Sequence, residues 1–120
     1  MRLLSFLLSF WLSLAAHAQP AVSEPEMKAG YLFNLALNTE WPENQRANFN
    51  ICLLGDEDVG QAMRKYDLRR INDQRVVIAR LTSMTPIRQC QVLFIGASEI
   101  VNLPKMLKIL EDLPVLTVTD

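Results

Sequence analysis

Four short, mainly apolar runs constrain the fold of this 120-residue chain more than any other feature of its sequence. Their length and their bulky aliphatic residues are typical of β-strands, and they occupy residues 49–54, 75–81, 92–95 and 114–118. Patterns typical of helices lie between or before them, at residues 26–38, 57–66 and 99–112. Strands that are apolar on both faces and alternate with helices predict an α/β fold, with a single small sheet flanked by helices.

The N-terminal segment has the composition of a signal peptide. Arg2 is followed by an unbroken apolar run over residues 3–15, and Ala16-His17-Ala18 is a small-x-small cleavage site. The apolar run is shorter than the ~20 residues that a membrane span needs, which makes an uncleaved anchor the weaker alternative. We therefore predict that residues 1–18 are removed on export to the periplasm, and that residues 19–120 form the mature domain.

The mature chain is predicted to contain no histidine, because the only one in the sequence is His17. Nucleophiles activated by histidine and zinc sites built on imidazole therefore cannot form. The acidic residues show no spacing that would bring two carboxylates together for acid–base catalysis. The slightly negative net charge also argues against a nucleic-acid partner. We expect no catalytic residues, no metal site and no cofactor.

The stretch "ICLLGDEDVG", residues 51–60, has the outline of a phosphate-binding loop, with Gly55 between a strand and a helix. However, Asp56, Glu57 and Asp58 stand where the phosphate would bind, and their charges already complement the helix dipole. No Gly-Lys-Ser/Thr sequence follows. We interpret the stretch as an ordinary strand-to-helix turn in which Asp56 is the N-cap.

The two cysteines, Cys52 in the first strand and Cys90 just before the third, predict a disulfide, since an even count in an exported chain is typical of one. Closing a loop of this length is worth roughly 4 kcal/mol by the chain-entropy relation. The alternative is a thiol enzyme or a metal-binding pair. It is disfavoured because the chain has no C-x-x-C motif and no mature histidine.

The helix at residues 26–38 has an apolar surface wider than a single core contact requires. Its large apolar residues are Tyr31, Leu32, Phe33, Leu35 and Leu37. Either the domain covers this helix on two sides, or one side meets a partner. Trp41 precedes Pro42 and ends the helix, because the position before a proline disfavours the α region. Trp41 either packs against the end of the domain or is a recognition residue.

The last predicted helix, residues 99–112, has a simpler apolar pattern. The helical period places one set of residues on a single face, namely Ile100, Leu103, Leu107 and Leu110. We expect this face to lie on the sheet.

Five segments, in this order, carry a resemblance to the YfiR-like family of periplasmic proteins: "KAGYLFNLALNTEWP", "NICLLGDEDVG", "RVVIARL", "CQVLFIGASE" and "LPVLTVTD". The resemblance covers nearly the whole mature chain. It implies a small, non-catalytic α/β regulator, dimeric in its best-known relative, that holds an inner-membrane diguanylate cyclase inactive by binding its periplasmic part. Release through an outer-membrane lipoprotein raises cyclic di-GMP and favours biofilm growth.

Several positions match the family pattern. Cys52 and Cys90 match its long-range cysteine pair, and Trp41 and Pro42 match its Trp-Pro. Our candidates for partner binding are Tyr31, Trp41 and Pro42.

The chain also departs from the family pattern at two places. Gln91 stands where the family usually has histidine. Family members also continue past the position of Asp120 with further strands and a helix, so the resemblance implies that the domain at residues 19–120 lacks these C-terminal elements. A second hypothesis is a periplasmic small-ligand-binding module, with the ligand at the carboxyl ends of the strands.

Overall fold

The structure is a computed structural model and describes residues 21–43 and 46–120. The predicted signal peptide at residues 1–18 lies outside the described residues. Within these two described ranges, no helix is long and apolar enough to cross a membrane.

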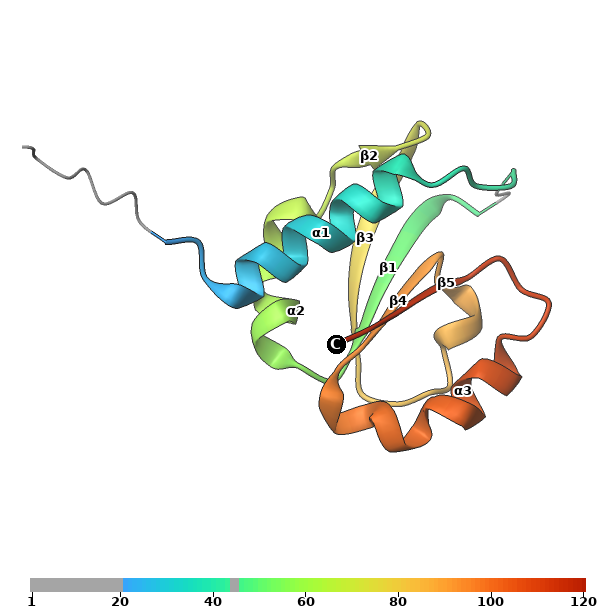
Figure 1. Cartoon of the computed structure of the whole chain (residues 1–120). Helices are drawn as coiled ribbons and strands as arrows, with labels where there is room; N and C mark the ends of the chain where they lie inside the picture. Colours follow the sequence, from blue (N-terminus) through green and yellow to red (C-terminus); the bar gives the residue numbers. More distant parts are fainter. Residues whose placement is uncertain (1–20, 44–45) are drawn as a thin grey trace, which may run out of the picture.

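A five-stranded sheet forms the centre of the molecule, in the order β2-β3-β1-β4-β5 (Figure 1). The strands are β1 (Asn48–Leu54), β2 (Arg70–Ile71), β3 (Gln74–Leu81), β4 (Val92–Ile95) and β5 (Leu116–Thr119). All are parallel except β2, which pairs with β3 in the antiparallel direction. The predicted α/β class is therefore confirmed.

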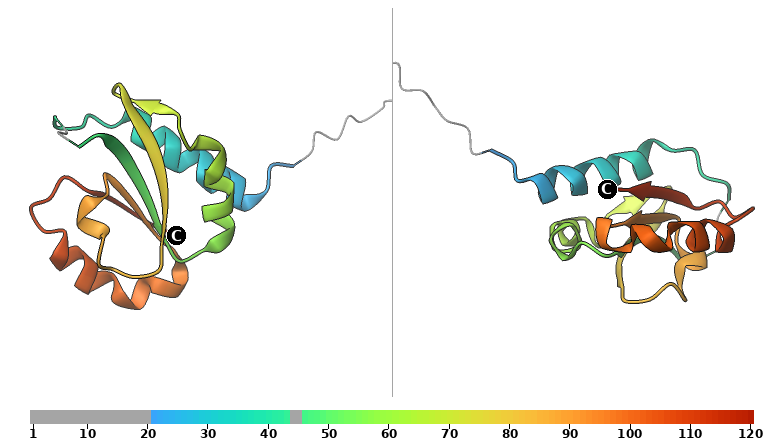
Figure 2. Two further views of the ribbon diagram at one scale, coloured as in Figure 1. Left: turned by 180° about the vertical axis from the view of Figure 1, so that it is seen from behind. Right: turned by 60° about the horizontal axis from the view of Figure 1, so that its bottom comes forward.

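Helices cover both faces of the sheet (Figure 2). The helices α1 (Glu24–Asn38) and α2 (Glu57–Met63) pack on one face, and α3 (Leu103–Ile109) packs on the other. Side chains alternate along β1, with Ile51 and Leu53 toward α1 and Cys52 and Leu54 toward α3. This two-sided cover explains why β4 and the second half of β1 are continuously apolar.

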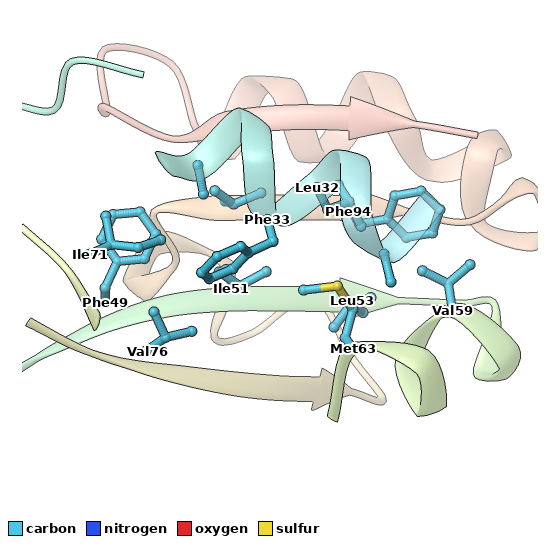
Figure 3. Packing of buried hydrophobic residues seen from close by; sticks show 13 residues of the cluster. Leu32, Phe33, Phe49, Ile51, Leu53, Val59, Met63, Ile71, Val76 and Phe94 are labelled. Atoms are coloured by element: carbon cyan, nitrogen blue, oxygen red, sulfur yellow. The ribbon is translucent and has the colours of Figure 1, made fainter. Parts of the chain in front are cut away.

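The two sides of the sheet have separate hydrophobic cores. The larger one lies between α1, α2 and the sheet (Figure 3), and its buried members are Ala29, Leu32, Phe33, Ala36, Phe49, Ile51, Leu53, Val59, Met63, Ile71, Val76, Val92 and Phe94. The smaller one lies under α3 and consists of Cys52, Leu54, Ile87, Cys90, Leu93, Ile95, Met106 and Leu110.

The helix α1 is covered on one side only within the described chain. Ala29 and Ala36 are fully buried, and their small side chains let the helix approach the sheet closely. On the opposite side, Tyr31 is 63% exposed, and Leu35 and Leu37 are also exposed. Two explanations were given for its wide apolar surface. The described residues do not support the first one, in which the domain covers the helix on two sides.

Two local predictions differ from the structure. The strand β2 is not among the four strands that the sequence predicts; Asn72 and Asp73 both adopt positive φ angles and form a tight hairpin turn between β2 and β3. In the last helical region, the predicted face is wrong in part, because Ile100 and Leu107 are exposed whereas Met106 is fully buried. The segment Ala97–Asn102 is a 3-10 helix, whose tighter turn takes Ile100 off the period of α3, and within α3 the buried side runs through Met106 rather than Leu107.

Candidate functional site

A hollow of about 620 Å³ lies at the amino ends of the parallel strands. The segments that lead into β1, β3, β4 and β5 all contribute to its wall. Its lining residues are Trp41, Pro42, Glu43, Arg46, Phe49, Asn72, Gln74, Arg88, Cys90, Gln91, Leu113, Pro114 and Val115. A hollow of this volume is within the range of small-molecule sites, and it can equally receive a side chain of a protein partner.

Trp41 has a fixed place at one wall of this hollow. Its indole Nε1–H donates a hydrogen bond of 2.8 Å to the carbonyl oxygen of Ala36, which would otherwise lack a partner at the end of α1. Its ring meets Phe49 edge to face, with ring centroids 5.1 Å apart. Trp41 therefore packs against the end of the domain and still presents part of its half-buried ring to the hollow.

The disulfide joins Cys52 of β1 to Cys90, which also lines the hollow, with 5.9 Å between the two Cα atoms. This is the bridge that the cysteine count predicts. Because both cysteines of the chain are paired, the thiol-enzyme alternative has no free nucleophile. The bridge holds the segment that enters β4 directly against β1.

Gln91, next to the bridge, adds hydrogen bonds between the same two strands. Its Oε1 accepts a bond of 2.6 Å from the backbone N–H of Asn50, and its own N–H donates to the Asn50 carbonyl oxygen over 2.9 Å. The Asn50 side chain donates to the Gln89 carbonyl oxygen over 2.9 Å. The disulfide and these hydrogen bonds thus form with Gln91 at the position where the family usually has histidine.

The charged residues of the hollow are two arginines and one glutamate. They are Arg46, Arg88 and Glu43. Beside the Trp41 ring, this set favours a partner group that combines an apolar body with negative charge.

The carboxyl ends of the strands, in contrast, are closed. A Cβ added to Gly96 would lie 2.9 Å from the backbone nitrogen of Asp56, so the two strand-to-helix turns cross at backbone contact. Asp56 caps α2, as predicted, because its side chain accepts a bond of 3.2 Å from the N–H of Val59. The cavity at this end has a volume of only about 50 Å³. The prediction that a ligand binds at the carboxyl ends is therefore wrong, since the glycines allow backbone to fill that space.

An ion-pair cluster next to this closed end was missed by sequence reasoning. Lys28 Nζ lies 2.6 Å from Asp120 Oδ1 and 2.8 Å from Glu24 Oε1. These hydrogen bonds, that to Asp120 first, raise the pKa of Lys28 above its ordinary value. The sequence feature that could have indicated this cluster is that Lys28 interrupts an otherwise apolar stretch of helix.

The three predicted partner-binding residues fall into two groups. Trp41 and Pro42 lie together at the hollow, whereas Tyr31 is on the exposed side of α1 and does not line it. Among residues 21–43 and 46–120, no group of three or more histidine, cysteine, aspartate or glutamate side chains could hold a metal ion.

These features define a class: a small three-layer α/β protein with a mostly parallel sheet, an internal disulfide and an exposed apolar side on α1. The family comparison then identifies the chain further. The YfiR/HmsC-like family model (DUF4154) matches residues 25–120, and the chain belongs to this family. The family is known in cyclic di-GMP regulation and is regulatory rather than catalytic. No curated protein matches the chain.

Proposed function

We propose that this protein is a non-enzymatic periplasmic regulator that represses a membrane-bound diguanylate cyclase by contacting its periplasmic part. Family membership supports the link to cyclic di-GMP. The disulfide supports an oxidising compartment such as the periplasm. An outer-membrane lipoprotein that sequesters the repressor would complete the switch.

The exposed apolar side of α1 is the observation that carries the proposal. Met27, Tyr31 and Leu35 follow one another at four-residue intervals and are 49%, 63% and 44% exposed. Residues at this spacing form a continuous stripe on a helix. An apolar stripe of this kind is typical of a helix that docks on another protein.

Deletion of the gene in its host, with cyclic di-GMP measured in cell extracts, tests the proposal. We expect the level to rise after deletion and to return when the wild-type gene is supplied. A Tyr31→Asp variant should fold but fail to restore the low level, because the new charge cannot be buried at an apolar contact.

Leu68→Asp provides the matched control. Leu68 is also a large apolar residue, 65% exposed, but it lies between the 3-10 helix Arg64–Tyr66 and β2 rather than on α1. Its positive φ angle is one that aspartate tolerates. Restoration by Leu68→Asp but not by Tyr31→Asp supports the proposed surface. An unchanged cyclic di-GMP level after deletion contradicts the function itself.

A second candidate, a small-ligand-binding module, is favoured by one observation, the hollow beside Trp41. A thermal-shift screen with amino acids, organic acids and nucleotides tests it. A compound that raises the melting temperature of the wild type but not of an Arg88→Ala variant would support binding in the hollow. If no compound raises the melting temperature, regulation by protein contact remains the better supported function.

A further inference from the structure

Positive charge is concentrated in the stretch that runs from the end of α2 into β3. Its cationic residues are all exposed and are Arg64, Lys65, Arg69, Arg70 and Arg75. Within residues 21–43 and 46–120, none of these side chains lies within ion-pair distance of a carboxylate. The charge of this stretch is therefore not neutralised by the described protein.

A tyrosine accounts for two of these cations. The ring of Tyr66 stacks on Phe33 of α1, with 4.5 Å between the ring centroids, which fixes its position. Lys65 Nζ lies 5.4 Å and Arg69 Cζ lies 5.9 Å from the centroid of the Tyr66 ring. Both distances are short enough for cation–π attraction. Lys65 and Arg69 thus have a structural role beside Tyr66.

Arg70 and Arg75 face each other across the hairpin that β2 and β3 form at the edge of the sheet (Figure 1). The next pair is hydrogen-bonded, because the N–H of Val76 donates to the Arg69 carbonyl oxygen over 2.7 Å. Since the two kinds of pair alternate, Arg70 and Arg75 form a non-hydrogen-bonded pair, in which the Cα atoms are only about 4.5 Å apart. Like charges directly opposite are destabilising, so this pair requires an explanation.

The arginine pair lies on the face of the sheet that is turned away from α1. Ile71 and Val76, the neighbours of Arg70 and Arg75, are both buried in the core under α1. Side chains alternate between the two faces along a strand. The pair is therefore separate from the exposed apolar stripe of α1.

Hydrogen bonds of the hairpin leave most of the guanidinium donors available. Arg70 Nη1 donates to the Asp73 carbonyl oxygen over 2.8 Å, which holds this guanidinium at the turn and uses one of its five N–H groups. The nearby Asp67 has another role, because its Oδ1 accepts a bond of 3.1 Å from the N–H of Ile78. Neither arginine is neutralised by these contacts.

We propose that Arg70 and Arg75 together bind the phosphate group of a phosphate monoester. Such a group carries nearly two negative charges above neutral pH, because its second pKa is about 6. Two charges match the two guanidinium groups, whereas a carboxylate would neutralise only half of the pair. Guanidinium groups donate paired hydrogen bonds to phosphate oxygens, and a monoester has three such oxygens for the two arginines.

This site goes beyond the proposed repression of a cyclase and does not depend on it. Cyclic di-GMP levels test the repression, whereas the following experiments measure phosphate binding alone.

Thermal unfolding of the purified exported protein at pH 8 is the first test. Inorganic phosphate and glycerol 3-phosphate should raise the melting temperature more than sodium chloride does at the same ionic strength, since a ligand of the folded state stabilises it. Arg70→Gln and Arg75→Gln should each weaken binding about tenfold or more, because charge-assisted hydrogen bonds are lost. Without phosphate, Arg75→Gln should melt no lower than the wild type, because the repulsion is removed.

Arg64→Gln is the matched control. It removes the same charge from an exposed position in the 3-10 helix Arg64–Tyr66, outside the hairpin, and should bind phosphate as the wild type does. Equal weakening by Arg64→Gln and Arg75→Gln would show attraction to the general surface charge, and would overturn the proposed site.

A phosphate titration followed by the backbone amide signals in NMR locates the site. The largest shifts should fall within residues 69–76 and should be absent in Arg75→Gln. Shifts that are largest elsewhere, or the absence of any shift and of any phosphate-specific rise in melting temperature, would overturn the proposal.

Sedimentation with lipid vesicles identifies the source of the phosphate group. Phosphatidic acid carries a phosphate monoester, and vesicles that contain it are compared with vesicles of phosphatidylcholine alone. Sedimentation with phosphatidic acid that Arg75→Gln abolishes would assign the site to a lipid headgroup. Binding of glycerol 3-phosphate without sedimentation would assign it to a soluble ester. Both results support the arginine site.

Discussion

The two ends of the parallel strands are built in opposite ways. At the carboxyl ends, Gly55 and Gly96 let two turns meet at backbone distance, and the remaining cavity is about 50 Å³. At the amino ends, Trp41 and the Cys90 side of the disulfide stand apart around a hollow of about 620 Å³. Open α/β sheets usually bind ligands at their carboxyl ends. In this protein that end is filled by packed backbone, and we propose that recognition takes place at the amino end and at the outer side of α1.

The largest expected effect comes from breaking the disulfide at the amino end. Cys52 and Cys90 are separated by 38 positions, for which the chain-entropy relation gives a loss of about 4 kcal/mol in the free energy of unfolding. Urea unfolding of the Cys52→Ala/Cys90→Ala double variant, followed by circular dichroism, measures this loss. A loss below about 1 kcal/mol would show that the amino end does not depend on the bridge.

A methyl group at the carboxyl end should have the next largest effect. In Gly96→Ala, the new Cβ meets backbone atoms that cannot move aside, so we expect a loss of about 1–3 kcal/mol in the free energy of unfolding. Gly30→Ala is the matched control. The nearest atom there is the Tyr66 hydroxyl oxygen at 3.7 Å, and a helical alanine should stabilise the protein by up to about 1 kcal/mol. Equal destabilisation by both variants would argue against a closed carboxyl end.

A smaller effect is expected from Trp41→Phe at the amino end. The variant keeps an aromatic ring against Phe49 but loses the hydrogen bond to the Ala36 carbonyl oxygen. We expect a loss of about 1 kcal/mol, which urea unfolding can resolve. If the stability does not change, the indole N–H is not a significant cap of α1.

The smallest effect should come from Lys28→Met, which removes the ion pairs beside the carboxyl end. The pKa of Lys28 is raised in the folded protein, so its contribution is complete below the ordinary value near 10.5 and is lost as the pH rises through the folded-state pKa. The urea midpoint of the wild type should exceed that of the variant at pH 7. The difference should shrink in about 1 M salt and again at high alkaline pH. A difference that is independent of both salt and pH would point to lost packing of the lysine stem instead.

Some of this structure could be predicted from the sequence, and the reasons are physical. The second half of β1 and the whole of β4 are buried on both faces, so the sequence has unbroken apolar runs at residues 51–54 and 92–95. The N-cap role of Asp56 could be predicted because capping depends on residues close in sequence. The disulfide could be predicted from the number of cysteines, without knowledge of the fold. Two-residue β2 leaves no such run, because a single turn stabilises it.

Other features depend on segments that meet only in three dimensions. Lys28 and Asp120 come from opposite ends of the chain, and neither neighbourhood in the sequence indicates the other. The hollow is formed by four separate segments that enter the sheet. Sequence reasoning could single out Trp41 and Pro42 at its wall, but it could not show that they stand apart from Tyr31.

The most direct test of the central claim is a measurement of diguanylate cyclase activity in detergent-solubilised membranes from a host strain that lacks this gene. The purified protein is added, and the conversion of GTP to cyclic di-GMP is followed, with Tyr31→Asp and Leu68→Asp as matched variants. We predict that the wild type and Leu68→Asp lower the activity, and that Tyr31→Asp does not. Activity that is unchanged by the wild-type protein would contradict repression by direct contact.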